Sequence, residues 1–284
     1  MDRRIIAATL TLLTLLVLSL RYGPLNLLQF VCFMAGHSLL SLRLALSRDL
    51  VDTSWHGQAE FIMRELKRHP LSSQVARLVV DIGAHDGVWQ SNSHVFLQAG
   101  WRGLLIEPHE RTYSSLQRNV GRRFPNARLV RAAVTASLHA SPGRVVTRGW
   151  LDGTENRVDN ATDCDGPACV TMLPLPLLLA REGVPRRFAF LSLDVEWGPA
   201  GTARALRAML AHGYRPEILC VENAELFARP FVLEPAGYRK LLRVRYDTIF
   251  RLNSSLGSSR ERAQDRLPRR IVRPQRAEAL ALNE

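Results

Sequence analysis

A buried strand that runs directly into a glycine loop constrains the fold of this chain most strongly. Leu78-Val79-Val80 is a continuous apolar run, typical of a strand covered on both faces. Asp81-Ile-Gly83-Ala84-His-Asp86-Gly87 follows at once, and glycines let a chain turn tightly and bring backbone against a ligand. The N–H groups at the start of a following helix would point into the same turn. The pattern predicts a nucleotide-type binding loop in an α/β domain.

The chemistry of the loop narrows the ligand. A dinucleotide loop would read Gly-x-Gly-x-x-Gly, whereas this one has only Gly83 and Gly87, and Asp86 would repel a pyrophosphate. Glu107, 24 residues after Gly83, ends the next strand-like run at the spacing of an acid that binds a ribose hydroxyl. S-adenosylmethionine has no phosphate and carries an ammonium, a sulfonium and a ribose diol, so acids favour it. The expected cofactor-binding residues are Asp81, Gly83, Ala84, Asp86, Gly87 and Glu107.

Strands and helices alternate along the rest of this region. Strands are expected at 104–107, 129–134, 188–193 and 218–221, and helices after Gly87, around Tyr113 to Val120, at 175–181 and at 202–211. Residues 136–170 are polar and rich in turn formers, and are expected to be an irregular stretch over the acceptor pocket. This order predicts a Rossmann-like, doubly wound, mostly parallel sheet whose ligands bind at the carboxyl ends of the strands.

Two segments carry a resemblance to a known family: residues 81–93 with Gly100 to Pro108, and Phe190-Leu-Ser-Leu-Asp194-Val-Glu196. The first is similar to the opening half, and the second to the Asp-x-Glu-Gly strand end, of the FkbM family of S-adenosylmethionine-dependent O-methyltransferases. The resemblance spans residues 56–252 and implies a class I methyltransferase fold that methylates a hydroxyl of a glycan or small metabolite. The chain departs from the family at Trp197-Gly198-Pro199, where the glycine is displaced and a second glutamate is absent.

Asp194 and Glu196 are the candidate catalytic bases, since a carboxylate beside the acceptor could take its proton. The departure at Trp197 and Pro199 motivates an alternative, a catalytically silent binding or trafficking protein with the same fold. A nicotinamide oxidoreductase is a third reading, disfavoured by Asp86 and the missing third glycine.

The N-terminus predicts attachment to a membrane. Ile5 to Leu20 carries no charge and is flanked by arginines, and as a helix it would span roughly 24 Å of a hydrocarbon core of about 30 Å. It is either a secretory signal or a short anchor, and the absence of a small-x-small cleavage site favours an uncleaved signal anchor over residues 1–21. Residues 22–55 would be an interfacial helix, a second span or an amphipathic stem, followed by a catalytic domain at 56–252. The expected location is an endomembrane of the secretory pathway, with a domain facing the cytosol as the other topology.

The chain is strongly basic and has few cysteines. The net charge is +12, and all but two of the 38 basic residues are arginine. No basic run interleaved with aromatics occurs before the tail, so nucleic acid is not an expected partner. Residues 253–284 are arginine-rich, poor in large apolar residues and expected to be disordered. Cys164 and Cys169 form either a local disulfide or two idle thiols, and no metal site is expected.

Overall fold

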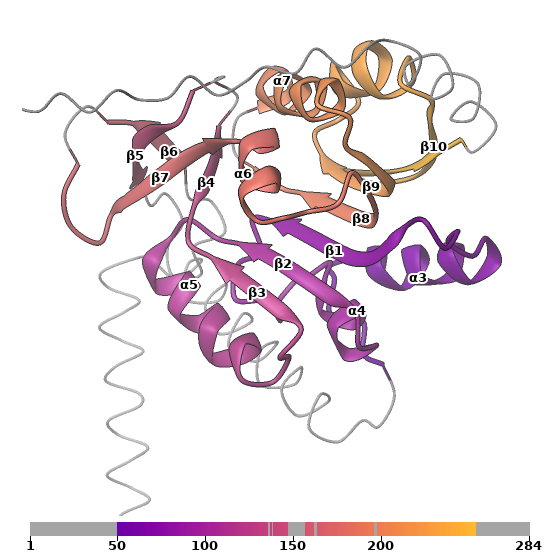
Figure 1. Cartoon of the computed structure of the whole chain (residues 1–284), viewed down its shortest axis with the longest axis horizontal. Coiled ribbons are helices and arrows are strands. Elements are labelled where there is room, and N and C mark those ends of the chain that lie inside the picture. Colours follow the sequence, from indigo (N-terminus) through magenta and orange to yellow (C-terminus); the bar gives the residue numbers. More distant parts are fainter. Residues whose placement is uncertain are drawn as a thin grey trace, which may run out of the picture. The chain divides into compact units, whose positions relative to one another are not determined.

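A seven-stranded mixed sheet with helices on both faces forms the centre of the protein (Figure 1). The computed structural model describes residues 50–135, 137, 139–146, 157–161, 164–195 and 198–253. The chain divides into two compact units, residues 1–252 and 253–284, and the elements below belong to the first. The strands of the main sheet are β1 (Ala76–Ile82), β2 (Arg102–Ile106), β3 (Ala127–Val130), β8 (Arg187–Leu193), β9 (Arg215–Glu222), β10 (Tyr238–Val244) and β11 (Asp247–Leu252).

The strand order is β10-β11-β9-β8-β1-β2-β3. Strands β1, β2, β3, β8 and β9 run parallel, and β11 runs antiparallel to both β9 and β10. The doubly wound α/β fold expected from the sequence is confirmed: four of the six strand pairings are parallel, as predicted, and the two pairings of β11 make the sheet mixed. Strand β1 has β2 on one side and β8 on the other, so the order of the strands reverses at β1. Open α/β sheets bind ligands at such a switch point, outside the carboxyl ends of the strands.

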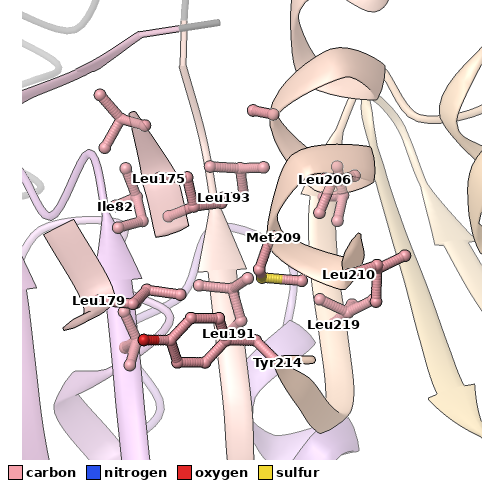
Figure 2. Packing of buried hydrophobic residues seen from close by; sticks show 14 of the residues in the cluster. Ile82, Leu175, Leu179, Leu191, Leu193, Leu206, Met209, Leu210, Tyr214 and Leu219 are labelled. Atoms are coloured by element: carbon pink, nitrogen blue, oxygen red, sulfur yellow. The ribbon is translucent and has the colours of Figure 1, made fainter. Parts of the chain in front are cut away.

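Alternate residues of β1 pack into two separate cores, which explains its continuous apolar run. Leu78, Val80 and Ile82 face one core, whereas Val79 faces the other. Helices α6 (Leu175–Arg181) and α7 (Gly198–Ala211) and the π-helix η2 (Arg229–Leu233) cover the first core. Figure 2 shows Leu206, Met209 and Leu210 of α7 against Leu191 and Leu219 of the sheet. The second core lies under α3 (Gln58–Arg68), α4 (His94–Gln98), α5 (Glu110–Leu116) and the π-helix η1 (Gln117–Gly121).

A second, four-stranded sheet corrects the prediction of an irregular stretch over residues 136–170. Its strands are β4 (Ala133–Thr135), β5 (Ser141–Val146), β6 (Arg157–Asn160) and β7 (Cys169–Pro174), in the order β4-β7-β5-β6. The expected strand 129–134 is divided between β3 of the main sheet and β4 of this one. The sequence does not indicate these strands because polar residues occupy the side of the sheet that is not packed. The packed side forms a small core of Ala133, Val145, Val170 and Met172.

The helix expected directly after Gly87 is also shorter than predicted. Helix α4 begins only at His94, because the preceding segment pairs with the chain that enters the domain. Ser54 forms an isolated parallel bridge with Gln90, and Thr53 Oγ1 donates to the Ser91 carbonyl at 3.3 Å.

No helix within the described residues is both long and apolar enough to cross a bilayer. The predicted anchor at residues 1–21 and the segment up to residue 49 lie outside the described residues, as do residues 254–284 of the expected tail.

Candidate functional site

The glycine loop joins the ends of three neighbouring strands. The Gly83 and Ala84 N–H groups both donate to the Ile106 carbonyl of β2 at 3.0 Å. Gly83 has φ +87°, and a Cβ there would collide with the Asp194 carbonyl oxygen after β8. Only glycine allows this approach of β1 to β8 at the switch point.

Gly87 serves a different purpose from Gly83. Its φ is +74°, and a Cβ would lie 2.5 Å from Leu116 Cδ1 and 2.6 Å from Val120 Cγ2. This glycine therefore lets α5 and η1 pack closely on the loop. His94 Nδ1 lies 2.8 Å from the Gly87 carbonyl, and burial, the largest influence, lowers the pKa of this imidazole and keeps it neutral.

Glu107 connects the loop to the start of α5. The carboxylate is buried, with Oε2 accepting from the His85 N–H at 3.0 Å and Oε1 from the His109 N–H at 2.9 Å. Burial outweighs these hydrogen bonds and raises the pKa of Glu107 to about 7. A carboxyl group that titrates near neutrality at the end of β2 is a candidate ligand for a ribose diol.

Asp86 is turned into its own loop. Its Oδ1 accepts from the Val88 N–H at 2.9 Å and from the Trp89 N–H at 2.7 Å. Burial opposes the charged form, but hydrogen bonds from His85 and these two amides prevail and lower the pKa of Asp86. Asp86 therefore stays ionised and shapes the loop. Its contact with a cofactor stays a prediction.

Asp81 lies in a buried polar network between β1 and β8. It is 3% exposed and stands opposite Ser192 in the parallel register. Burial raises the pKa of Asp81, and hydrogen bonds with Ser93 and Ser192 oppose that rise. Asn92 Nδ2 also donates to Ser192 Oγ at 3.2 Å. Neither serine was predicted from the sequence, because a strand residue such as Ser192 gives no local signal of what stands opposite it.

Of the two predicted catalytic acids, Asp194 lies within the described residues and Glu196 does not. Asp194 follows β8, is exposed, and donates its N–H to the Ile82 carbonyl at 3.0 Å, so it lies beside the glycine loop. Glu196 and Trp197 lie outside the described residues. Pro199 belongs to α7, which begins at Gly198, earlier than the predicted start at residue 202.

Asp247 is an acid at the same edge that the sequence reasoning did not single out. It begins β11 opposite Glu222 of β9, and Gln58 Nε2 donates to its Oδ2 at 2.8 Å. Gln58 Oε1 in turn accepts the His56 N–H at 2.7 Å. Burial raises the pKa of Asp247, against the Gln58 hydrogen bond and the nearby His56. A search of parallel strand ends misses Asp247, because β11 is antiparallel and its first residue lies at that edge.

Cys164 and Cys169 are joined in a disulfide, one of the two states left open by the sequence. Arg131 Nη2 donates to the carbonyls of Pro167 and of Cys169, the latter at 3.0 Å. Arg131 Nη1 also lies 2.8 Å from Glu110 Oε2. A hollow of about 430 Å³ borders the disulfide, and no charged residue lines it. Within the described residues, no group of histidine, cysteine and acid side chains is arranged to hold a metal ion.

Comparison with known proteins supports the resemblance stated above. Residues 81–196 match the family model described as the methyltransferase FkbM domain, a segment that runs from the end of β1 to just after β8. The resemblance to the FkbM family is thereby confirmed over residues 81–196. No curated protein matches the chain.

Solved methyltransferase structures match this chain at low identity and low TM-score. The FkbM methyltransferase of Methylobacillus flagellatus KT is 16% identical with a TM-score of 0.41, over 62% of this chain and 43% of that one. The N-terminal domain of human METTL16 is 10% identical with a TM-score of 0.37, over 67% and 66% of the two chains. A putative caffeoyl-CoA O-methyltransferase from Staphylococcus aureus is 8% identical with a TM-score of 0.41, over 78% and 96%. This chain thus spans less than half of the first of these structures and about two thirds of the second.

Proposed function

We propose that this protein is a membrane-anchored, S-adenosylmethionine-dependent O-methyltransferase that acts on a hydroxyl of a glycan or small metabolite. The observation that carries the proposal is the loop from Gly83 to Gly87 together with Glu107, inside the segment that matches the FkbM methyltransferase domain. Residues 1–21 would supply the anchor.

The residues at the loop fit this cofactor. Gly83 has a positive φ angle and no side chain, so the loop presents bare backbone at the switch point, and His85 next to it is also left-handed. Each Glu107 oxygen accepts one amide and keeps a further lone pair, so the carboxylate can accept both hydroxyls of a ribose diol. Asp81, Glu107 and Asp194 suit a cofactor with an ammonium and a sulfonium group, because a nearby cation favours the ionised form of a carboxyl group.

Bound S-adenosylmethionine would supply an activated methyl group, so the protein has mainly to align the acceptor and receive a proton. Asp194 is exposed beside the loop and is our candidate for the proton acceptor, with Glu196 two residues further on. Positioning of donor and acceptor can account for most of the rate enhancement in such a displacement.

Isothermal titration of the purified chain with S-adenosylmethionine and S-adenosylhomocysteine tests the cofactor. Glu107→Gln should weaken binding roughly tenfold to hundredfold, because hydrogen bonds to a charged group contribute about 1.5–3 kcal/mol. Glu60→Gln removes an exposed acid of α3 and should bind normally. Asp81→Asn should weaken binding and also stability, since Asp81 is buried. The absence of binding by the unaltered chain at millimolar cofactor would refute the proposal.

One feature favours the alternative of a catalytically silent fold. Glu107 and Asp86 already bind the amides of their own loop, so the loop can hold its shape through internal bonds alone. Release of S-adenosylhomocysteine by the unaltered chain, reduced in Asp194→Asn, would exclude this alternative.

We also propose that the domain faces the lumen of the secretory pathway. The Cys164–Cys169 disulfide supports an oxidising compartment, because thiols stay reduced in the cytosol. Asn160-Ala-Thr162 would then be an acceptor site for N-glycosylation. A loss of mass on glycosidase treatment, absent in Thr162→Ala, is the expected result, and an unmodified Asn160 in the expressed full chain would contradict it.

A further inference from the structure

The two edges of the main sheet carry opposite charges. Acids gather at the edge where the parallel strands end, and we call the other edge, where they begin, the arginine edge. Every strand of the sheet has an arginine within two residues of that edge, at Arg77, Arg102, Arg128, Arg187, Arg215, Arg239 and Arg251. Since β11 is antiparallel, its arginine stands near its end rather than its beginning.

The turns and helix ends that lead into these strands add further positive charge. They contribute Lys67, Arg68, Arg122, Arg123, Arg181 and Arg186, all of them exposed.

The acids near this edge do not neutralise it. Glu65, Glu182 and Glu217 each lie within 3.0 Å of one arginine, and Glu234 lies 3.2 Å from another. Exposed Arg77, Arg102 and Arg122 form no ion pair within the part of the chain that the structure describes.

Two pairs of arginines stand directly opposite each other on neighbouring strands. Arg187 faces Arg215 in the parallel pair β8 and β9, and Arg239 faces Arg251 in the antiparallel pair β10 and β11. Like charges in this arrangement destabilise a sheet. Within these pairs, Arg187 lies 2.8 Å from Glu217, and Arg215 and Arg251 donate to backbone carbonyls, so these three side chains have partners in the chain. An anionic partner would offset the remaining positive charge of this edge.

The row suits an extended anionic surface. Seven strands at about 4.8 Å spacing make it roughly 29 Å long. Guanidinium groups bind phosphate oxygens in a bidentate manner and are less strongly hydrated than ammonium groups, which favours arginine over lysine at a phosphate-rich surface.

The path of the chain indicates which surface this is. Val51 N–H donates to Gln98 Oε1 at 2.9 Å, and Gln98 ends α4 only four residues before Arg102 begins β2. The chain therefore enters the domain on the side of the arginine edge. The 49 residues before Leu50 contain the charge-free run Ile5 to Leu20 that we propose as the anchor, so the bilayer that holds this anchor is the nearest extended anionic surface.

We infer that the arginine edge docks on anionic lipid headgroups in the lumenal leaflet of the bilayer in which the N-terminus is anchored. The edge with Glu107, Asp194 and Asp247 then faces away from the membrane, and the methyl acceptor approaches from the aqueous side. This inference rests on the membrane attachment proposed above and is independent of cofactor binding.

Hydrogen exchange of the full-length chain in lipid nanodiscs tests it. Nanodiscs of phosphatidylcholine alone are compared with nanodiscs that also contain phosphatidylserine. The turns at 69–76, 122–126 and 212–214 should exchange more slowly with the anionic lipid, since they lead into strands at the arginine edge. The triple variant Arg77→Gln, Arg102→Gln, Arg122→Gln should lose this protection. The matched control Arg144→Gln, Arg243→Gln, Arg245→Gln removes the same charge from exposed positions away from this edge and should keep it.

Equal exchange in the two lipids would overturn the inference, as would an equal loss of protection in the two triple variants. Protection by a heparin oligosaccharide in solution, without protection by phosphatidylserine, would also overturn it in favour of a soluble polyanion. A chain that does not enter nanodiscs at all would refute the attachment and the docking together. Failure of the cofactor titration, in contrast, would refute only the proposed methyl transfer.

Discussion

The pH dependence of stability offers a sharp test of the environment of Glu107. The pKa of this carboxyl is raised from 4.5 to about 7, with burial as the largest cause. The folded protein therefore binds the proton more tightly than the unfolded chain does. Stability from this group is fully present below pH 4.5, falls as the pH rises, and is lost above pH 7.

The magnitude follows from the two pKa values. The difference corresponds to about 3 kcal/mol in total, of which about 2.5 kcal/mol falls between pH 5 and pH 8. Glu107→Gln cannot titrate. The NH₂ group of the glutamine faces one of the two backbone N–H groups that donate to Glu107 in the unaltered protein. This should reduce the free energy of unfolding by about 1–3 kcal/mol, independently of pH.

Urea unfolding of the unaltered chain and of Glu107→Gln, followed by circular dichroism at pH 5, 6, 7 and 8, isolates the effect. The stability difference between the two proteins should shift by about 2.5 kcal/mol in favour of the variant from pH 5 to pH 8. Other titrating groups, such as Asp81, contribute to both proteins and cancel. Parallel pH profiles would show that Glu107 is ionised throughout and that our account of its burial is wrong.

Three further substitutions have defined outcomes. Gly83→Ala should destabilise the protein in thermal unfolding by more than the roughly 1 kcal/mol expected for Gly100→Ala. Both glycines have positive φ angles, but only Gly83 lacks room for a Cβ, so equal losses would contradict this. Replacing Cys164 and Cys169 by serine should cost about 2 kcal/mol in urea unfolding, from the entropy of the short loop that the disulfide closes, and an unchanged midpoint would show that the disulfide does not form. Tyr238→Phe should cost about 1 kcal/mol, since its buried hydroxyl donates to a backbone carbonyl at 2.7 Å, and a neutral result would mean that this bond is absent in solution.

Local patterns were sufficient for the parallel part of the sheet and for the glycine loop. A strand with both faces buried must be apolar throughout, and Leu78-Val79-Val80 shows this without reference to any partner. The positive φ angles of Gly83 and Gly87 are likewise a property of the residue type. For these reasons the sequence alone located β1, the loop and the acid that ends β2.

Features that depend on contacts between distant segments could not be predicted from local sequence patterns. The apolar residues of β5 to β7 are few and interrupted by exposed ones because their sheet has only a small core, and their pairing joins positions up to about 30 residues apart. Asp247 reaches the acidic edge because β11 reverses direction, and Asp86 turns inward because the amides of Val88 and Trp89 lie within its reach.

The sequence by itself therefore determined the type of fold, the binding loop and the excess of arginine, because these follow from residue type and local spacing. Only the tertiary structure decided where the charges lie. Strand direction brings one arginine of every strand of the main sheet to the edge where the parallel strands begin, and brings Asp81, Glu107, Asp194 and Asp247 to the other edge, although these residues are scattered along the chain. This separation of charge depends on pairing between distant strands, and our proposals of a cationic cofactor at the acidic edge and an anionic surface at the arginine edge both rest on it.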